Sequence, residues 1–166
     1  MSPSTPSRRY SRTPFPPYRY IPGRSPHPTR DPAGHSFGTD RPVQASVDLQ
    51  DWPRCEPYLY GIDLFNHGFW WEAHEAWEQC WIAAGKTTET GLFMQGLIQV
   101  AAALLKQHQG HTGAARRLAR EGLEKFPLRH DPLLGIDTAG FKTALGNYFS
   151  GKSGAPPPLI LYNFNA

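Results

Sequence analysis

The uneven distribution of proline constrains the fold of this chain more than any other feature. Ten of its 17 prolines lie in residues 1–46. There they exclude regular helix and most sheet, because proline fixes φ and has no backbone N–H. The 166 residues suffice for one domain and are too few for two domains with a linker. We therefore expect a single folded body preceded by an extended arm.

The arm divides into two parts by its content of aromatic residues. Residues 1–13 consist mainly of Ser, Pro, Thr and Arg, which is typical of a disordered tail. From residue 14 aromatics alternate with prolines, which predicts a polyproline-like strap over residues 14–53 that packs on the body. The aromatics expected to pack are Phe15, Tyr18, Tyr20 and Phe37. A cleaved transit peptide would explain the Arg and Ser content of the arm but not its aromatics.

The rest of the chain has the hydrophobic periodicity of an all-α protein. Capping residues and glycines separate the periodic segments, so we expect an irregular array of four to five helices within a helical domain over residues 54–150. The expected helices cover about residues 56–66, 69–84, 88–109, 112–126 and 138–151. Residues 151–166 form a Pro-rich C-terminal tail that is too apolar for a free end, so we expect it to pack back on the body.

Charge and hydropathy exclude several classes of protein. Residues 1–46 carry seven Arg and two Asp, whereas residues 47–166 carry ten basic and twelve acidic residues. The arginines of the arm are scattered singly and without Lys, so we do not expect a nucleic-acid partner. No run of about 18 apolar residues exists and no apolar segment follows Met1, so neither a membrane span nor a secretory signal is expected. The two cysteines, Cys55 and Cys80, have no metal-binding spacing, which favours a cytoplasmic location.

An unusual histidine lies on the expected second helix. At about 100° per residue, large apolar residues form a stripe along this helix, which predicts a core face. The stripe consists of Trp70, Ala73, Trp77 and Trp81. His74 lies in the middle of it, and Glu78 follows one turn later, where its carboxylate can meet the imidazole. Because a buried imidazole needs partners for both nitrogens, we expect further polar groups nearby.

The expected third helix offers such groups. Gln95 and Gln99 are one turn apart on a stripe of small residues, so we predict a network with His74 and Glu78 between the two helices. In one interpretation the network and Glu75 form a pocket for a small polar ligand or a divalent metal. In the other, the network only fixes the helix register of a non-catalytic module that binds a protein partner. No residue is assigned a catalytic role, and whether the protein is an enzyme stays open.

The same segment has a spacing close to that of a metal site. His74-Glu75-x-x-Glu78 differs from the zinc-protease pattern His-Glu-x-x-His only in its last residue. Helical geometry would place His74 and Glu78 on one metal, with Glu75 beside it as a base. A zincin needs a second histidine at the last position, so the pattern does not predict a zinc hydrolase.

A second candidate metal set lies in the arm. His27, Asp31 and His35 are spaced by four residues, and the two intervening prolines exclude a helix. A looped strap could still bring the three side chains over the body near His74 as ligands. The alternative is a turn in which Asp31 and the histidines hydrogen-bond to nearby backbone groups.

A double motif carries a resemblance to a known family. Its elements are Glu72-Ala-His-Glu-x-x-Glu78-x-x-Trp81 and Gln95-Gly-Leu-Ile-Gln99-x-Ala-Ala102. Over about residues 58–126 the chain resembles the family called domain of unknown function 309. The resemblance implies a small all-α fold of four or five helices and no established activity. Residues 17–20 and 34–36 are also similar to an N-terminal extension of some bacterial members, which implies a native arm. The first helical pair is more loosely similar to a tetratricopeptide unit, without a repeat array.

Overall fold

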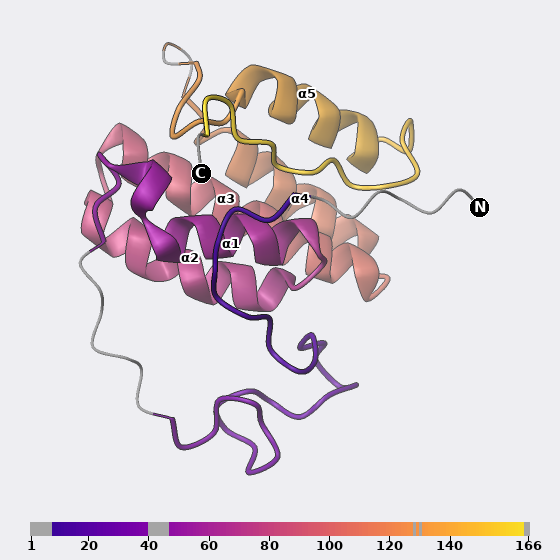
Figure 1. The fold of residues 1–166 in the computed structure, drawn as a ribbon. Helices are drawn as coiled ribbons and strands as arrows, with labels where there is room; N and C mark the ends of the chain where they lie inside the picture. The colour runs from indigo at the N-terminus through magenta and orange to yellow at the C-terminus, as the bar shows by residue number, and fades with distance from the viewer. Residues whose placement is uncertain (1–7, 40–46, 128, 130, 165–166) are drawn as a thin grey trace.

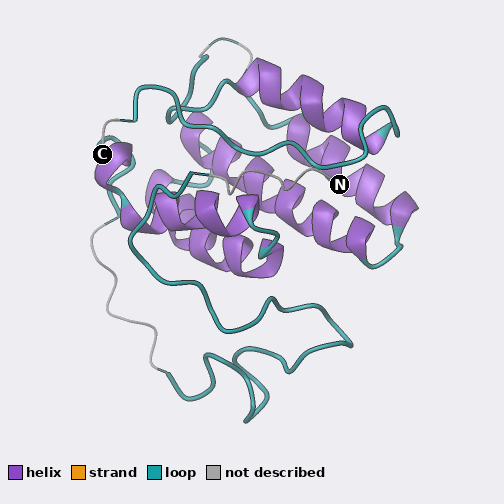
Figure 2. Ribbon diagram, turned by 45° about the vertical axis from the view of Figure 1, so that its right-hand side comes forward, coloured by secondary structure: helices purple, strands orange, loops and turns teal. Residues whose placement is uncertain are grey.

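The computed structural model describes residues 8–39, 47–127, 129 and 131–164. These residues form a short 3-10 helix, η1 (Trp52–Arg54), and five α-helices, with no strand among them. The α-helices are α1 (Glu56–Asn66), α2 (Trp70–Ala84), α3 (Glu89–His108), α4 (Thr112–Leu123) and α5 (Thr138–Phe149). This confirms the expected all-α class with an extended N-terminal arm, which Figure 2 shows in teal below the helices.

Short turns join the first four helices, and each of them packs against the next. Figure 1 shows α1 and α2 side by side, with α5 above them. Side-chain caps start two helices, because Thr88 Oγ1 accepts a hydrogen bond from the backbone N–H of Gly91 at 3.0 Å and Asp137 Oδ1 accepts one from Gly140 at 2.7 Å. In the described part of the chain, no helix has the length and apolar character needed to cross a membrane.

The centre of the core is Trp77 on α2, which is fully buried. Its indole N–H donates to the backbone carbonyl of Tyr58 at 3.3 Å, and its ring centroid lies 5.8 Å from that of Phe65. The ring also lies directly over Gly61, where a Cβ would collide with the indole nitrogen. Because Gly61 has no side chain, the Trp77 indole can pack directly against the backbone of α1.

α3 and α4 approach each other through two glycines. A Cβ placed on Gly96 would lie 2.6 Å from the carbonyl oxygen of Gly122, and one on Gly122 would lie 2.8 Å from the carbonyl oxygen of Gly96. The Cβ of Gln99 borders the same contact, 3.1 Å from the position of a Cβ on Gly122. The stripe of small residues on α3 therefore faces α4.

A buried carboxylate on α1 holds the start of the described arm. The Asp63 side chain is fully buried and accepts four hydrogen bonds. They come from Arg9 Nε at 2.9 Å, the backbone N–H of Tyr10 at 2.9 Å, and the backbone N–H and hydroxyl of Ser11 at 2.8 and 2.6 Å. The arm thus gives a buried charge both a counter-ion and backbone donors.

At the first residue of α1, a second carboxylate holds the next residues of the arm. Glu56 Oε1 accepts hydrogen bonds from the backbone N–H groups of Arg12 and Thr13, each at 2.9 Å, and from the Thr13 hydroxyl at 2.7 Å. The expectation of a disordered tail over residues 1–13 is therefore wrong for residues 9–13. Its first seven positions lie outside the described residues.

Two of the four strap aromatics pack on the helices. The ring of Phe15 stacks on Phe69 at 5.1 Å, and the ring of Tyr20 meets Trp71 edge-on at 5.2 Å. Tyr18 instead joins two parts of the strap, because its hydroxyl donates to the carbonyl of Pro26 at 2.9 Å and accepts from the backbone N–H of residue 35 at 3.1 Å. Phe37 is 48% exposed, so the expectation that it packs on the body is wrong.

The C-terminal tail packs over α1 and meets the arm there. The Asn66 side chain donates to the carbonyl of Leu159 at 2.8 Å and accepts from its N–H at 2.7 Å. Leu159, Leu161 and Phe164 are buried, and the Phe164 ring lies 5.2 Å from that of Tyr10. The paired amide thus fixes the register of the tail on the body.

Candidate metal centre

The expectation that His74 lies in the middle of the core face of α2 is wrong. The buried line of α2 consists of Glu72, Ala73, Trp77 and Cys80, whereas the His74 side chain is 24% exposed. α2 packs against both α1 and α3, so its buried arc centres on Ala73 and Trp77. His74 therefore lies at the edge of this arc and faces a different side of the helix.

On that side the structure brings three of the predicted residues together. His74 Nε2 lies 3.4 Å from Glu78 Oε1 and 3.6 Å from Glu75 Oε1. One ligand atom from each of the three side chains lies within 4.8 Å of the others. The side chains of His74, Glu75 and Glu78 are 24%, 28% and 37% exposed, so the group is open to solvent. Among the described residues it is the single group of three or more His, Cys, Asp or Glu whose ligand atoms lie close enough together to hold one metal ion.

A hydrogen bond to the His74 ring determines which of its two nitrogens carries the proton when the ring is neutral. His74 Nδ1 lies 2.7 Å from the backbone carbonyl oxygen of Trp71. A carbonyl can only accept, so Nδ1 carries the proton and the neutral ring presents an unprotonated Nε2. Nε2 lies 3.4 and 3.6 Å from two carboxylate oxygens, so a cation placed between the three atoms would be attracted to all of them.

The predicted network with α3 is not formed. Among the described residues, no hydrogen bond or ion pair joins His74 or Glu78 to Gln95 or Gln99. Gln99 lies at the contact of α3 with α4, and its Oε1 is buried without a hydrogen-bond partner in the described structure. The physical reason is the pair of glycines, which turns the small stripe of α3 towards α4 and away from α2.

The histidines of the strap are also not assembled into a ligand set. His27 Nδ1 accepts hydrogen bonds from the backbone N–H groups of residues 29 and 30, both at 3.3 Å, so its proton resides on Nε2 in the neutral ring. Asp31 accepts from the backbone N–H two residues later at 2.9 Å, as in an Asx turn. His35 reaches α2, where its Nε2 lies 3.3 Å from Glu72 Oε1. The contacts of His27 and Asp31 fit the turn alternative, whereas His35 contacts a side chain of the helical body.

The strap nevertheless reaches the triad of His74, Glu75 and Glu78 through Trp71. The ring of Trp71 lies 5.7 Å from His74 on one side and 5.6 Å from His27 on the other, measured between centroids. The ring of Tyr20 lies 5.0 Å from His27. Rings of the arm, in tilted and edge-on contacts, therefore reach Trp71 beside the triad, although they supply no ligand atom to it.

Sequence reasoning missed Glu72 as a site residue. Its side chain is 5% exposed, and its Oε1 accepts from the backbone N–H of Tyr20 at 2.7 Å as well as meeting His35. Its Oε2 is buried and has no hydrogen-bond partner among the described residues. Burial raises the pKa of Glu72, and the hydrogen bonds from Tyr20 and His35 oppose that rise. The available signal was its place as first residue of the Glu-Ala-His-Glu motif.

The raised pKa of Glu72 predicts a particular pH dependence of stability. The folded protein holds the proton more tightly than the unfolded chain, so this contribution is fully present below the unfolded pKa and is lost as the pH rises through the folded one. The side chain that the Glu72→Gln substitution introduces cannot ionise. As the pH rises from about 4, we therefore expect the free energy of unfolding of the variant to increase relative to that of the wild type. Urea denaturation at a series of pH values measures this difference.

Glu121→Gln on α4 is the matched control, because Glu121 is exposed. Its difference from the wild type should change little over the same pH range. A Glu72→Gln difference that is equally flat would contradict the desolvation of this carboxylate.

Comparison with known proteins gives one family. The family model described as Domain of unknown function (DUF309) matches residues 58–118, which run from α1 into the first half of α4. No curated protein sequence matches the chain. The matched segment contains α2 and the whole triad, whereas the arm, α5 and the C-terminal tail lie outside it. The match over residues 58–118 supports the resemblance to this family that the sequence indicated.

Proposed function

We propose that α2 binds a divalent cation through His74, Glu75 and Glu78. The observation that carries the proposal is the environment of the His74 ring, whose Nδ1 donates to a backbone carbonyl at 2.7 Å and whose Nε2 lies 3.4 and 3.6 Å from two carboxylate oxygens. Histidines that ligate metals almost always donate their other N–H to a carbonyl or carboxylate, which fixes both the tautomer and the ring direction.

The spacing of the donor atoms suits a small transition-metal ion. Two ligands about 2.1 Å from a tetrahedral ion lie about 3.4 Å apart. The separations of His74 Nε2 from the two carboxylate oxygens are 3.4 and 3.6 Å. A donor set of one imidazole and two carboxylates favours Zn²⁺, Mn²⁺ or Fe²⁺ over Ca²⁺, which prefers sites made only of oxygen ligands.

The proposed centre would be open. Three protein ligands leave at least one coordination position, and the partial exposure of the triad lets water or a small anion reach it. The proposal concerns binding and assigns no reaction. We place it in the cytoplasm, in keeping with two cysteines that are both free thiols.

Metal titration of the full chain tests this proposal. By isothermal titration calorimetry we expect one equivalent of Zn²⁺ or Mn²⁺ to bind, and His74→Gln or Glu78→Gln to weaken the affinity at least about tenfold, because each removes a ligand. The affinity should fall on acidification, since the imidazole must be neutral to bind metal. Circular dichroism checks that the variants remain folded.

Two exposed residues of the same types provide matched controls. His111→Gln and Glu121→Gln change an exposed histidine and an exposed carboxylate on the α4 segment and should leave the affinity unchanged. The proposal is overturned if the wild type takes up no metal. It is also overturned if the controls weaken binding as much as the triad variants.

A further inference from the structure

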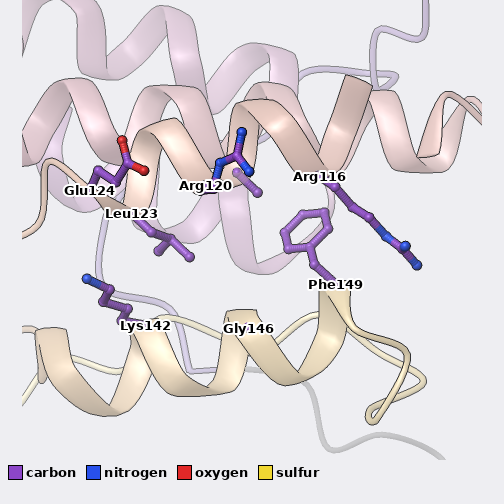
Figure 3. A pocket seen from close by; sticks show the side chains of 8 residues that line it. Arg116, Arg120, Leu123, Glu124, Lys142, Gly146 and Phe149 are labelled. Atoms are coloured by element: carbon purple, nitrogen blue, oxygen red, sulfur yellow. The ribbon is translucent and has the colours of Figure 1, made fainter. Parts of the chain in front are cut away.

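A hollow lies between α4 and α5, almost entirely outside the DUF309 segment. Figure 3 shows it from close by, and its volume is about 240 Å³. The residues that line it are Arg116, Ala119, Arg120, Leu123, Glu124, Lys142, Gly146 and Phe149. Of these, Arg116 alone belongs to residues 58–118. The hollow is therefore built from a part of the chain that the family match does not cover.

The space exists because small residues face each other across the two helices. Ala119 lies on α4, and Gly146 lies on α5 with no side chain at all. A Cβ added at Gly146 would meet no heavy atom within 4 Å. A larger side chain at this position therefore has open space beside the lining of the hollow.

The floor of the hollow is apolar. Ala119 is buried, and the half-buried side chains of Leu123 and Phe149 point into the space between α4 and α5 (Figure 3). Concave apolar surface of this kind favours the apolar body of a ligand. At about 240 Å³ the hollow is smaller than sites for drug-sized ligands, which take about 300–1,000 Å³, so its ligand is small.

The rim of the hollow is cationic. Arg116 and Arg120 stand one turn apart on α4, and Lys142 stands opposite on α5, against the single carboxylate of Glu124. Within the described residues, none of these three cations forms an ion pair or a side-chain hydrogen bond. By contrast, Arg9 pairs with Asp63 elsewhere in the structure. The rim thus offers donors that suit a carboxylate or a similar acidic head.

We propose that the hollow between α4 and α5 binds a small amphipathic monoanion, an unbranched carboxylate whose apolar chain lies on Leu123 and Phe149. The carboxylate head lies at the rim, which carries Arg120 on α4 and Lys142 on α5. This site is distinct from the proposed cation site on α2 and would exist without it.

Octanoate is the probe, and two ligands with the same eight-carbon chain are its controls. In a ¹H–¹⁵N NMR titration of the full chain, we expect octanoate to shift amides of α4 and α5 with a dissociation constant of about 1 mM or tighter, as suits a ligand of about ten non-hydrogen atoms. Uncharged 1-octanol should bind at least about tenfold more weakly, and octylammonium should not bind at the rim. Equal binding of all three ligands, or no binding of octanoate, overturns the proposal.

Substitutions separate the rim from the general charge of α4. Arg120→Gln or Lys142→Gln should weaken octanoate binding about tenfold. Arg117→Gln, on the same helix but not lining the hollow, should leave it unchanged. Equal effects of Arg117→Gln and Arg120→Gln would overturn the proposal, because octanoate would then be attracted by the overall positive charge of α4 and not by the rim of the hollow.

Gly146→Leu blocks the hollow without depending on charge. Since the added side chain has free space and leucine favours helix over glycine, the variant should keep or raise the melting temperature while losing octanoate binding. Retained binding in this folded variant would overturn the assignment of the site to the hollow.

Discussion

Replacing Trp77 with alanine is expected to lower the free energy of unfolding by about 3–5 kcal/mol, because the large cavity left behind lies in a small core. Trp77 is fully buried against Phe65 and Gly61, and the substitution also removes the indole N–H that donates to the carbonyl of Tyr58. The helices on both sides are fixed by their own contacts, so they can close the cavity only in part. Urea denaturation with an unchanged m-value measures the loss.

Trp81→Ala is the matched control on the same helix. Trp81 lies on the stripe that the sequence predicted as core, but it is only partly buried, and its indole N–H has no partner among the described residues. We expect a loss less than half of that for Trp77→Ala. Equal losses would mean that the core is not centred on Trp77.

Asp63→Ala should have the second-largest effect, a loss of about 2–3 kcal/mol. The substitution removes the acceptor of four hydrogen bonds from residues 9–11 and leaves the backbone N–H groups of Tyr10 and Ser11 without their partner. We expect less than the loss of about 3–5 kcal/mol that is typical of breaking a fully buried ion pair, because the Arg9 side chain is 36% exposed and water can solvate it. Denaturation measures the loss, and hydrogen exchange should show faster exchange of these two amides.

Truncation before residue 14 distinguishes docking of the arm from a general role of Asp63. Without the arm the carboxylate has lost its donors, so Asp63→Ala in the truncated chain should be neutral or stabilising. A loss of the same size in both backgrounds would contradict the claim that Asp63 acts through the arm.

Most of the helical framework could be predicted because it depends on local sequence. The Thr88 and Asp137 caps and the glycine at position 85, with a φ of 83°, mark helix ends by properties of a few neighbouring residues. The docking of residues 9–13 could not be predicted in this way. Their composition is that of a disordered tail, and the carboxylates that hold them lie 43 to 54 residues away in the sequence.

The candidate site was predicted in part for a related reason. The helical spacing of His74, Glu75 and Glu78 correctly indicated that they could meet, since all three lie within one turn of one helix. The helical wheel could not show which arc of α2 is buried, nor whether Gln99 faces α2 or α4. Both depend on contacts between helices, here above all on the approach of Gly96 to Gly122.

The meeting of arm and tail over α1 has a consequence for the order of folding. Arg8 donates to the carbonyl of Phe164, and the N–H of Leu161 donates to the hydroxyl of Tyr10, so these bonds join residues 156 and 151 positions apart. Bringing such distant segments together costs chain entropy before any contact repays it, unless the intervening chain is already compact. We therefore expect the two ends to assemble on a preformed helical body, and fraying of one end to remove part of the surface that holds the other.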